Sequence, residues 1–169
     1  VEQSFRKFSD RPAFSSFGQV LTYAEIERKS GYVAAYLQTK LGLKKGDRVA
    51  LMSPNIMAFP VIMLGILKAG LVQVNVNPLY TPRELTHQLN DADTETIFIY
   101  GGVSDTLAEM IDHLSIKKVI IANLGDSTSD SSHSSEVNDR FKRAMTLNNL
   151  LKQGVDLRFI KPTIPSSDL

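Results

Sequence analysis

Cysteine is absent from this chain of 169 residues. Its absence excludes disulfides, thiolate nucleophiles and cysteine-based metal sites. A surplus of one charge sign is also missing, because 19 lysine and arginine residues nearly balance 18 acidic residues, leaving a net charge of +1. Nucleic acid is therefore not expected as a partner, since domains that bind it carry a basic surplus.

Glycine-rich phosphate loops are missing as well, because neither GxGxxG nor GxxxxGK(S/T) occurs in the chain. The most apolar stretch, Ile56 to Val76, is interrupted by Pro60, Lys68 and Gln73. It predicts a buried helix followed by a buried strand rather than a membrane span. The chain begins at Val1 without a signal-peptide pattern, so we expect it to be a piece of a longer protein.

The strongest local signals lie between Gly70 and Leu89. Leu71 to Val76 is rich in valine and predicts a strand, and Asn77-Pro78 ends it because proline donates no ladder hydrogen bond. Thr81, followed by proline and then by Glu84, predicts a helix that begins with a capping box. The turn between strand and helix therefore lies where open α/β sheets usually bind ligands.

Strands and helices alternate from Arg48 to Ala122 in the predicted structure. This alternation is typical of an α/β fold whose parallel sheet carries helices on both faces. Before it, Ala13–Phe17 and Val20–Thr22 flank Gly18-Gln19 and predict a small β-hairpin. Thr22 then opens a further helix, again with a glutamate three residues later.

The predicted organisation has three parts. Residues 1–122 form the α/β subdomain. Residues 123–139 are rich in serine and aspartate and contain neither lysine nor arginine, which predicts a flexible surface loop. Residues 140–169 form a helical segment and a linker, with a short last strand expected at residues 157–160.

Three features are candidates for chemistry. Ser53-Pro54-Asn55 is a candidate nucleophile turn, but without flanking glycines or an obvious base a helix cap is the better interpretation. Gly101-Gly102 follows a strand and precedes a helix, and it is interpreted as a plain turn rather than an anion site. Glu84 and Asp91 are interpreted as a capping residue and a surface residue rather than as paired carboxylates.

Histidine gives no metal-binding pattern. The three histidines, with no i, i+4 spacing, fall on different predicted elements. We therefore assign no metal ligand and no catalytic residue to this chain. The histidines are His87, His113 and His133.

Four segments in order resemble the N-terminal part of acyl-CoA synthetases, which belong to the adenylate-forming superfamily. Among these, bacterial long-chain fatty acid–CoA ligases are the most similar family. The resemblance covers residues 1–122 and returns near Lys161, and it leaves out the serine-rich loop. The segments are LTYAEIERKS (Leu21–Ser30), GLKKGDRVALMSPN (Gly42–Asn55), GILKAG (Gly65–Gly70) and VNVNPLYTPRELTHQLNDAD (Val74–Asp93).

The resemblance implies a two-step reaction in the parent enzyme. ATP and a fatty acid give an acyl-adenylate and pyrophosphate with Mg²⁺, and coenzyme A then takes the acyl group. The family's phosphate loop, adenine-contacting loop, ribose-binding aspartate and mobile lysine would lie beyond Leu169. This chain is therefore expected to be inactive alone, and to bind ATP, Mg²⁺ and coenzyme A at most weakly.

The resemblance also implies a place for the turn Asn77, Pro78, Leu79 and Tyr80, near the channel for coenzyme A. Some relatives contact the coenzyme's phosphates through arginines after the next strand, whereas residues 102–105 here read Gly-Val-Ser-Asp. The alternative is that the turn only fixes a strand–helix junction.

Two other functions stay open from the residues alone. One is a stand-alone α/β module that binds a nucleotide or small ligand, and the other is a structural or oligomerisation domain. The resemblance implies a cytoplasmic protein, leaving a homodimer and peripheral contact with the inner membrane as open partners. Acyl-chain length is not encoded here, because the residues expected to line the acyl tunnel lie mostly downstream.

Overall fold

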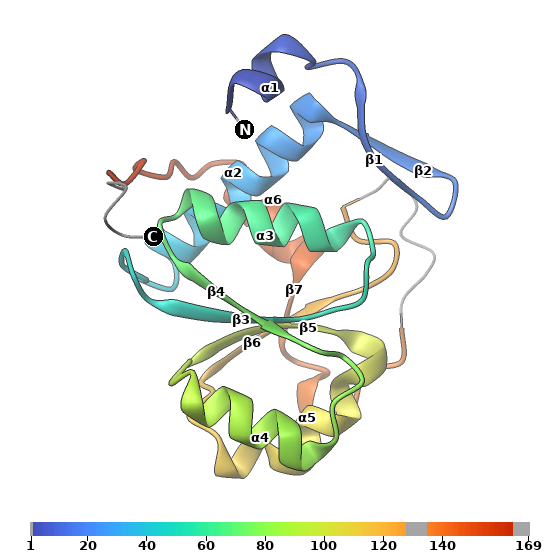
Figure 1. Cartoon of the computed structure of the whole chain (residues 1–169), viewed down its shortest axis with the longest axis vertical. Helices are drawn as coiled ribbons and strands as arrows, with labels where there is room; N and C mark the ends of the chain where they lie inside the picture. The colour runs from blue at the N-terminus through green and yellow to red at the C-terminus, as the bar shows by residue number, and fades with distance from the viewer. Residues whose placement is uncertain (1, 128–134, 164–169) are drawn as a thin grey trace.

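The computed structural model describes residues 2–127 and 135–163. It contains a five-stranded sheet with helices on both faces and a separate two-stranded antiparallel hairpin, which lies beyond the helices that cover one face (Figure 1). All neighbouring strands of the larger sheet run parallel. The predicted fold class is confirmed. The strands of the sheet are β3 (Arg48–Met52), β4 (Val72–Val76), β5 (Thr96–Tyr100), β6 (Lys118–Ala122) and β7 (Met145–Thr146).

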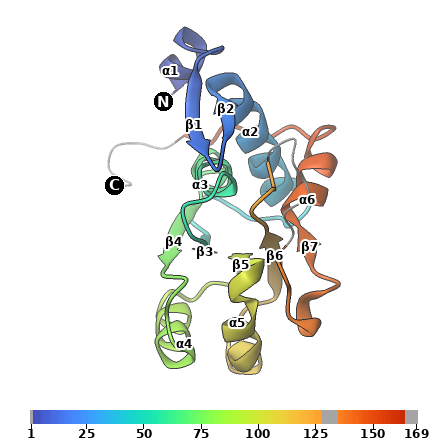
Figure 2. The ribbon, with the colours of Figure 1, turned by 90° about the vertical axis from the view of Figure 1, so that its right-hand side faces the viewer.

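Two helical layers enclose the sheet. Helices α2, α3 and α6 lie on one face, and α4 and α5 lie on the other (Figures 1 and 2). Alternate side chains of each central strand point to opposite faces, so Leu51 joins the first buried cluster and Ala50 the second. The helices are α1 (Glu2–Lys7), α2 (Tyr23–Thr39), α3 (Ala58–Lys68), α4 (Pro82–Asp91), α5 (Ser104–Met110) and α6 (Leu147–Gly154), with short 3₁₀ helices η1 (Gly101–Val103), η2 (Ile111–His113) and η3 (Asp139–Phe141).

The strands lie in the order β4-β3-β5-β6-β7, so the chain changes direction once as it crosses the sheet. The chain passes from β3 outward to β4, then returns across β3 to β5 and continues to β6 and β7. Such a reversal leaves a crevice at the carboxyl ends of the two strands where it occurs, here β3 and β5. The loops that follow these strands are therefore the first place to look for a site.

The hairpin consists of β1 (Pro12–Ser16) and β2 (Gln19–Thr22). Its two-residue turn is Phe17-Gly18, one residue earlier than the sequence predicts. Both residues have positive φ, 50° and 74°. This backbone matches a type I′ turn, whose twist suits a two-residue hairpin.

Both predicted capping boxes are present. At α2, the Glu25 amide donates to the Thr22 hydroxyl oxygen over 3.2 Å, and the Thr22 amide donates to the Glu25 carboxylate over 2.9 Å. The same pair of bonds links Thr81 and Glu84 at the start of α4. Local sequence alone therefore decides where these two helices begin.

The predicted cap at Ser53-Pro54-Asn55 is wrong. Helix α3 begins at Ala58, and no side chain caps it, because its N-cap is Met57. The Ser53 hydroxyl instead donates to the Pro54 carbonyl oxygen over 3.0 Å. Pro60 falls in the first turn of the helix, where its missing N–H costs nothing.

Strand β4 was predicted to be buried, and that prediction is wrong. Within the residues that the structure describes, β4 has a partner only on one side, and Val72 is 47% exposed. Its valine-rich sequence suits a strand buried on both faces, but the crossover places it at an edge of this sheet.

The last strand is also misplaced in the prediction. Residues 157–160 are irregular, and the fifth strand is Met145–Thr146, which pairs with Ile120 and Ile121 of β6. A two-residue strand is too short to show an alternating pattern. The expected flexible loop lies partly outside the described residues, at 128–134.

Candidate functional site at the carboxyl ends of the strands

Four loops meet at the carboxyl ends of the parallel strands. They begin with Ser53 after β3, Asn77 after β4, Gly101 after β5 and Asn123 after β6. Because the strands are parallel and in register, these positions share one end of the sheet. We call this set of loops the carboxyl edge.

The turn Asn77–Tyr80 is held by two hydrogen bonds to Asn77. The Leu79 amide donates to the Asn77 side-chain oxygen over 3.0 Å, and the Tyr80 amide donates to the Asn77 carbonyl oxygen over 3.1 Å. Tyr80 packs against the second buried cluster, whereas Leu79 is 86% exposed. The turn is therefore fixed by its own backbone and presents an apolar side chain outward.

The position after β5 is closed by close packing. A Cβ added to Gly101 would lie 2.8 Å from the side-chain oxygen of Asn123 and 3.0 Å from Val137. The same Asn123 oxygen accepts a hydrogen bond from the Ser135 amide over 3.3 Å. The lack of a side chain at Gly101 therefore allows Asn123 and Val137 to pack closely against it. This agrees with the interpretation of the glycine pair as a structural turn.

A buried polar cluster beyond β6 was missed at the sequence level. Asp126 is 4% exposed and accepts from the Asn123 amide over 2.8 Å, and burial raises its pKa to about 6. The hydroxyl of the next residue, Ser127, is buried and has no hydrogen-bond partner among the described residues. The Lys29 ammonium of α2 donates to the Ser127 carbonyl oxygen over 2.6 Å, and burial lowers the pKa of Lys29.

No signal in the sequence distinguished Asp126 from the other acidic residues of the serine-rich segment. The contact that holds the neighbouring Ser127 joins residues far apart in the chain, since Lys29 and Ser127 are separated by 98 positions. Such contacts have no local sequence pattern.

The remaining candidates do not assemble a reactive centre. His87 on α4 and His113 in η2 are both exposed, and His133 lies outside the described residues. Glu84 is engaged in the capping box, and its pKa is lowered by the Thr81 amide and hydroxyl. Across residues 2–127 and 135–163, no group of three or more histidine or acidic side chains is arranged to hold a metal ion.

The described residues of the carboxyl edge form no reactive centre but a well-fixed surface. It has a rigid turn, a packed glycine pair and a buried acid, but the described residues do not bring a nucleophile and a base together. Fold and site define a doubly wound α/β domain with a rigid carboxyl edge.

Comparison with known families identifies the chain further. Residues 1–163 match the model of the family described as AMP-binding enzyme. The chain belongs to the AMP-binding enzyme family. Among the helices that the structure describes, none combines the length and apolar character needed to cross a membrane.

Individual relatives agree with this assignment. The chain is 42% identical, over 99% of its length, to the long-chain-fatty-acid–CoA ligase of Escherichia coli O6:H1. It covers 32% of that protein, so it spans about a third of the length of the curated relatives it matches.

Solved structures share the fold. The benzoate CoA ligase of Burkholderia xenovorans LB400 superposes with a TM-score of 0.77 at 20% identity, over 97% of this chain and 29% of that one. A long-chain-fatty-acid-CoA ligase from Archaeoglobus fulgidus gives a TM-score of 0.72 at 19% identity, over 95% of this chain and 30% of that one. These structures show the shared fold, and the family match over residues 1–163 confirms the resemblance to adenylate-forming enzymes.

Proposed function

We propose that this chain is the N-terminal segment of a long-chain fatty acid–CoA ligase. The whole protein would join a fatty acid to the AMP part of ATP, release pyrophosphate, and transfer the acyl group to the sulfur of coenzyme A with release of AMP. The observation that carries the proposal is the 42% identity, across nearly the entire chain, to the E. coli long-chain ligase.

The residues of this segment do not by themselves fit ATP or Mg²⁺. The Gly101 position is filled by packing, and the described part of the chain holds no cluster of acidic or histidine ligands. The proposal therefore gives the described residues of this segment no chemical step. Its proposed role is to build one wall of the enzyme and to hold that wall rigid.

The turn Asn77–Tyr80 is the part of that wall we propose for coenzyme A. Its hydrogen bonds preorganise the backbone, and the exposed Leu79 side chain offers an apolar contact of the kind that a pantetheine arm accepts. The segment directly after β5 contains no arginine, since residues 102–105 are Gly-Val-Ser-Asp. Any cation for the coenzyme's phosphates must therefore come from another part of the protein.

One experiment tests the proposed reaction. The whole protein, incubated with ATP, Mg²⁺, coenzyme A and oleate, is expected to produce oleoyl-CoA, AMP and pyrophosphate, detected by chromatography. The 169-residue chain alone is expected to release no pyrophosphate. A whole protein that forms no acyl-CoA from any long-chain acid would refute the proposal, and tight calorimetric binding of ATP by the short chain would favour the stand-alone binding module.

A second experiment tests the turn. In the whole protein, Leu79→Glu places a carboxylate beside the proposed channel and is expected to raise the KM for coenzyme A about tenfold. The KM values for ATP and oleate should stay unchanged. Ile160→Glu is the matched control, because Ile160 is 82% exposed and lies in an irregular segment. If the two substitutions changed the KM for coenzyme A equally, the turn would have only a structural role.

The proposal extends to location and assembly. A ligase of fatty acids is expected in the cytoplasm, at or near the inner membrane surface, where its acyl substrates partition. A homodimer is a further expectation, which sedimentation of the whole protein would test. Both depend on the proposed substrate.

A further inference from the structure

A hollow of about 470 Å³ lies at the end of the sheet opposite the carboxyl edge. It is bounded by the start of β6, by the turn that leads into β7 and by the last turn of α2. Its lining contains four basic side chains and no acidic one. The basic residues are Lys117, Lys118, Arg140 and Arg143.

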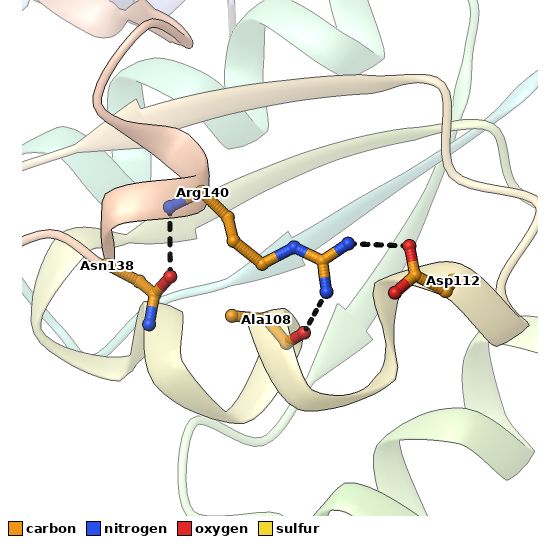
Figure 3. A network of polar contacts seen from close by, with 4 residues as sticks. All are labelled: Ala108, Asp112, Asn138 and Arg140. Carbon is orange, nitrogen blue, oxygen red and sulfur yellow. Dashed lines mark hydrogen bonds and ion pairs between the residues drawn. The ribbon is translucent and has the colours of Figure 1, made fainter.

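Two of these cations are already neutralised. Lys117 forms an ion pair with Glu95. The Arg140 guanidinium donates to Asp112 over 2.5 Å and to the Ala108 carbonyl oxygen over 3.1 Å, as Figure 3 shows. These contacts point Arg140 toward α5 and η2 and engage both of its terminal nitrogens.

The other two cations are not neutralised. Lys118 is the first residue of β6, and Arg143 lies two residues before Met145, which pairs with Ile120 of the same strand. Both side chains are exposed, and neither has an ion-pair partner among the residues that the structure describes. Two like charges held at one hollow repel each other, and an anion between them would relieve that repulsion.

Tyr36 supplies a neutral donor to the same hollow. The residue is only 6% exposed, and burial raises its pKa, so the phenol keeps its proton at neutral pH. Its hydroxyl makes no hydrogen bond to any other part of the chain that the structure describes. A hydroxyl with no other partner among the described residues, on a residue that lines a cationic hollow, is suited to donate to an anionic oxygen.

We propose that this pocket binds a phosphate group, with Lys118 and Arg143 as its cations and the Tyr36 hydroxyl as a neutral donor. Arginine and lysine together with a hydroxyl are a common set of partners for phosphate oxygens. The phosphate belongs either to a free anion or to the headgroup of an anionic lipid. The site is independent of the ligase proposal, because its residues lie at the opposite end of the sheet from the turn Asn77–Tyr80.

Titration with inorganic pyrophosphate tests the free anion. In a ¹⁵N-labelled chain, the amide signals of residues 117–120 and 143–145 should shift in a saturable way. Lys118→Gln combined with Arg143→Gln should weaken binding at least about tenfold, because both unpaired cations are lost. Raising the NaCl concentration should weaken binding of the unaltered chain, since these cations are exposed to solvent and screened by salt.

The matched control carries the same change of charge elsewhere. Lys152→Gln combined with Arg158→Gln removes one lysine and one arginine that are exposed and do not line the pocket. This control should bind pyrophosphate like the unaltered chain. Far-ultraviolet circular dichroism of both double variants checks that they are folded.

Sedimentation with vesicles tests the lipid source. Vesicles that contain phosphatidylglycerol should retain the chain, whereas pure phosphatidylcholine vesicles should not, and the pocket double variant should lose this retention. Pyrophosphate binding without vesicle binding assigns the site to free phosphates, and the reverse assigns it to headgroups.

Three results would overturn the proposal. The first is that neither probe binds, and the second is that the pocket variant and the control bind equally well. The third is that the 169-residue chain binds pyrophosphate, but the amide signals of the same residues do not shift when the whole protein is titrated. That last result would mean that the pocket is covered in the complete molecule.

Discussion

Gly65 of α3 lies so close to Val33 of α2 that a Cβ added to Gly65 would stand 2.5 Å from the Val33 Cβ. The carbonyl oxygen of Ser30 would lie 3.1 Å from the same added atom. Both helices belong to the layer that covers one face of the sheet, and Val33 is completely buried. The absence of a side chain at Gly65 therefore sets how closely these two helices pack.

Gly65→Ala is expected to destabilise the fold by about 3 kcal/mol, because the added methyl group overpacks a helix contact that includes backbone. The free energy of unfolding in urea measures the effect. Gly31→Ala in α2 is the matched control, since a Cβ there would meet only Phe159 at 3.8 Å. That control should stabilise the protein by about 0.5–1 kcal/mol through helix propensity. Equal losses at the two positions would contradict the close packing at Gly65.

Thr81→Ala is expected to destabilise the protein by about 1 kcal/mol at pH 7, because α4 loses its N-cap. Thr81→Ser keeps the hydroxyl and should stay close to the unaltered protein. The Thr81 amide and hydroxyl lower the pKa of Glu84, so this interaction stabilises the fold above the carboxyl's ordinary pKa of 4.5.

The same interaction is lost as the pH falls through the lowered pKa of Glu84. The stability difference between Thr81→Ala and the unaltered protein should therefore shrink between pH 5 and pH 2. Urea unfolding at several pH values measures it. The residue-81 amide is present in both proteins, so a difference that is constant over this range would show that the Thr81 hydroxyl has no share in lowering the pKa of Glu84.

Asp126→Asn is expected to stabilise the protein at pH 8. Burial raises the pKa of Asp126 from 3.8 to about 6, so the folded state holds a proton that the unfolded state releases in this window. Stability attributable to Asp126 therefore falls as the pH rises from about 4 to about 6 and is level above it.

Asparagine avoids burying the charge and can still accept from the Asn123 amide, so the gain at pH 8 should reach up to about 3 kcal/mol and vanish near pH 4. Asp156→Asn, at an exposed position, is the control and should change little at either pH. A loss of stability at pH 8 in Asp126→Asn would mean that the ionised carboxylate is needed.

The Arg140–Asp112 ion pair (Figure 3) is expected to contribute little by itself, because both side chains are exposed. A double-mutant cycle with Arg140→Ala and Asp112→Ala should give a coupling energy of about 0.5 kcal/mol, decreasing with added salt. Arg140→Ala should cost more than Asp112→Ala, since it also removes the donor to the Ala108 carbonyl oxygen. A coupling energy well above 1 kcal/mol would contradict this.

Helix starts were predictable because their causes lie within four residues. Thr22 with Glu25, and Thr81 with Glu84, form the bonds that their spacing predicts. Ser53 shows the limit of such reasoning, because a suitable cap residue was present but its hydroxyl bonds to the neighbouring Pro54 carbonyl. A local pattern thus states what a residue can do, and competing local bonds decide what it does.

The sequence by itself determined the alternation of strands and helices, the two capping boxes and the membership of a ligase-like family, since each depends on neighbouring residues or on ordered motifs. Only the tertiary structure decided that β4 lies at an edge, that Met145–Thr146 completes the sheet and that Asp126 is buried. It also brought Lys118, Arg143 and Tyr36 to one pocket. The physical reason is that strand order and burial depend on which distant segments pack together, and such contacts follow no period along the chain.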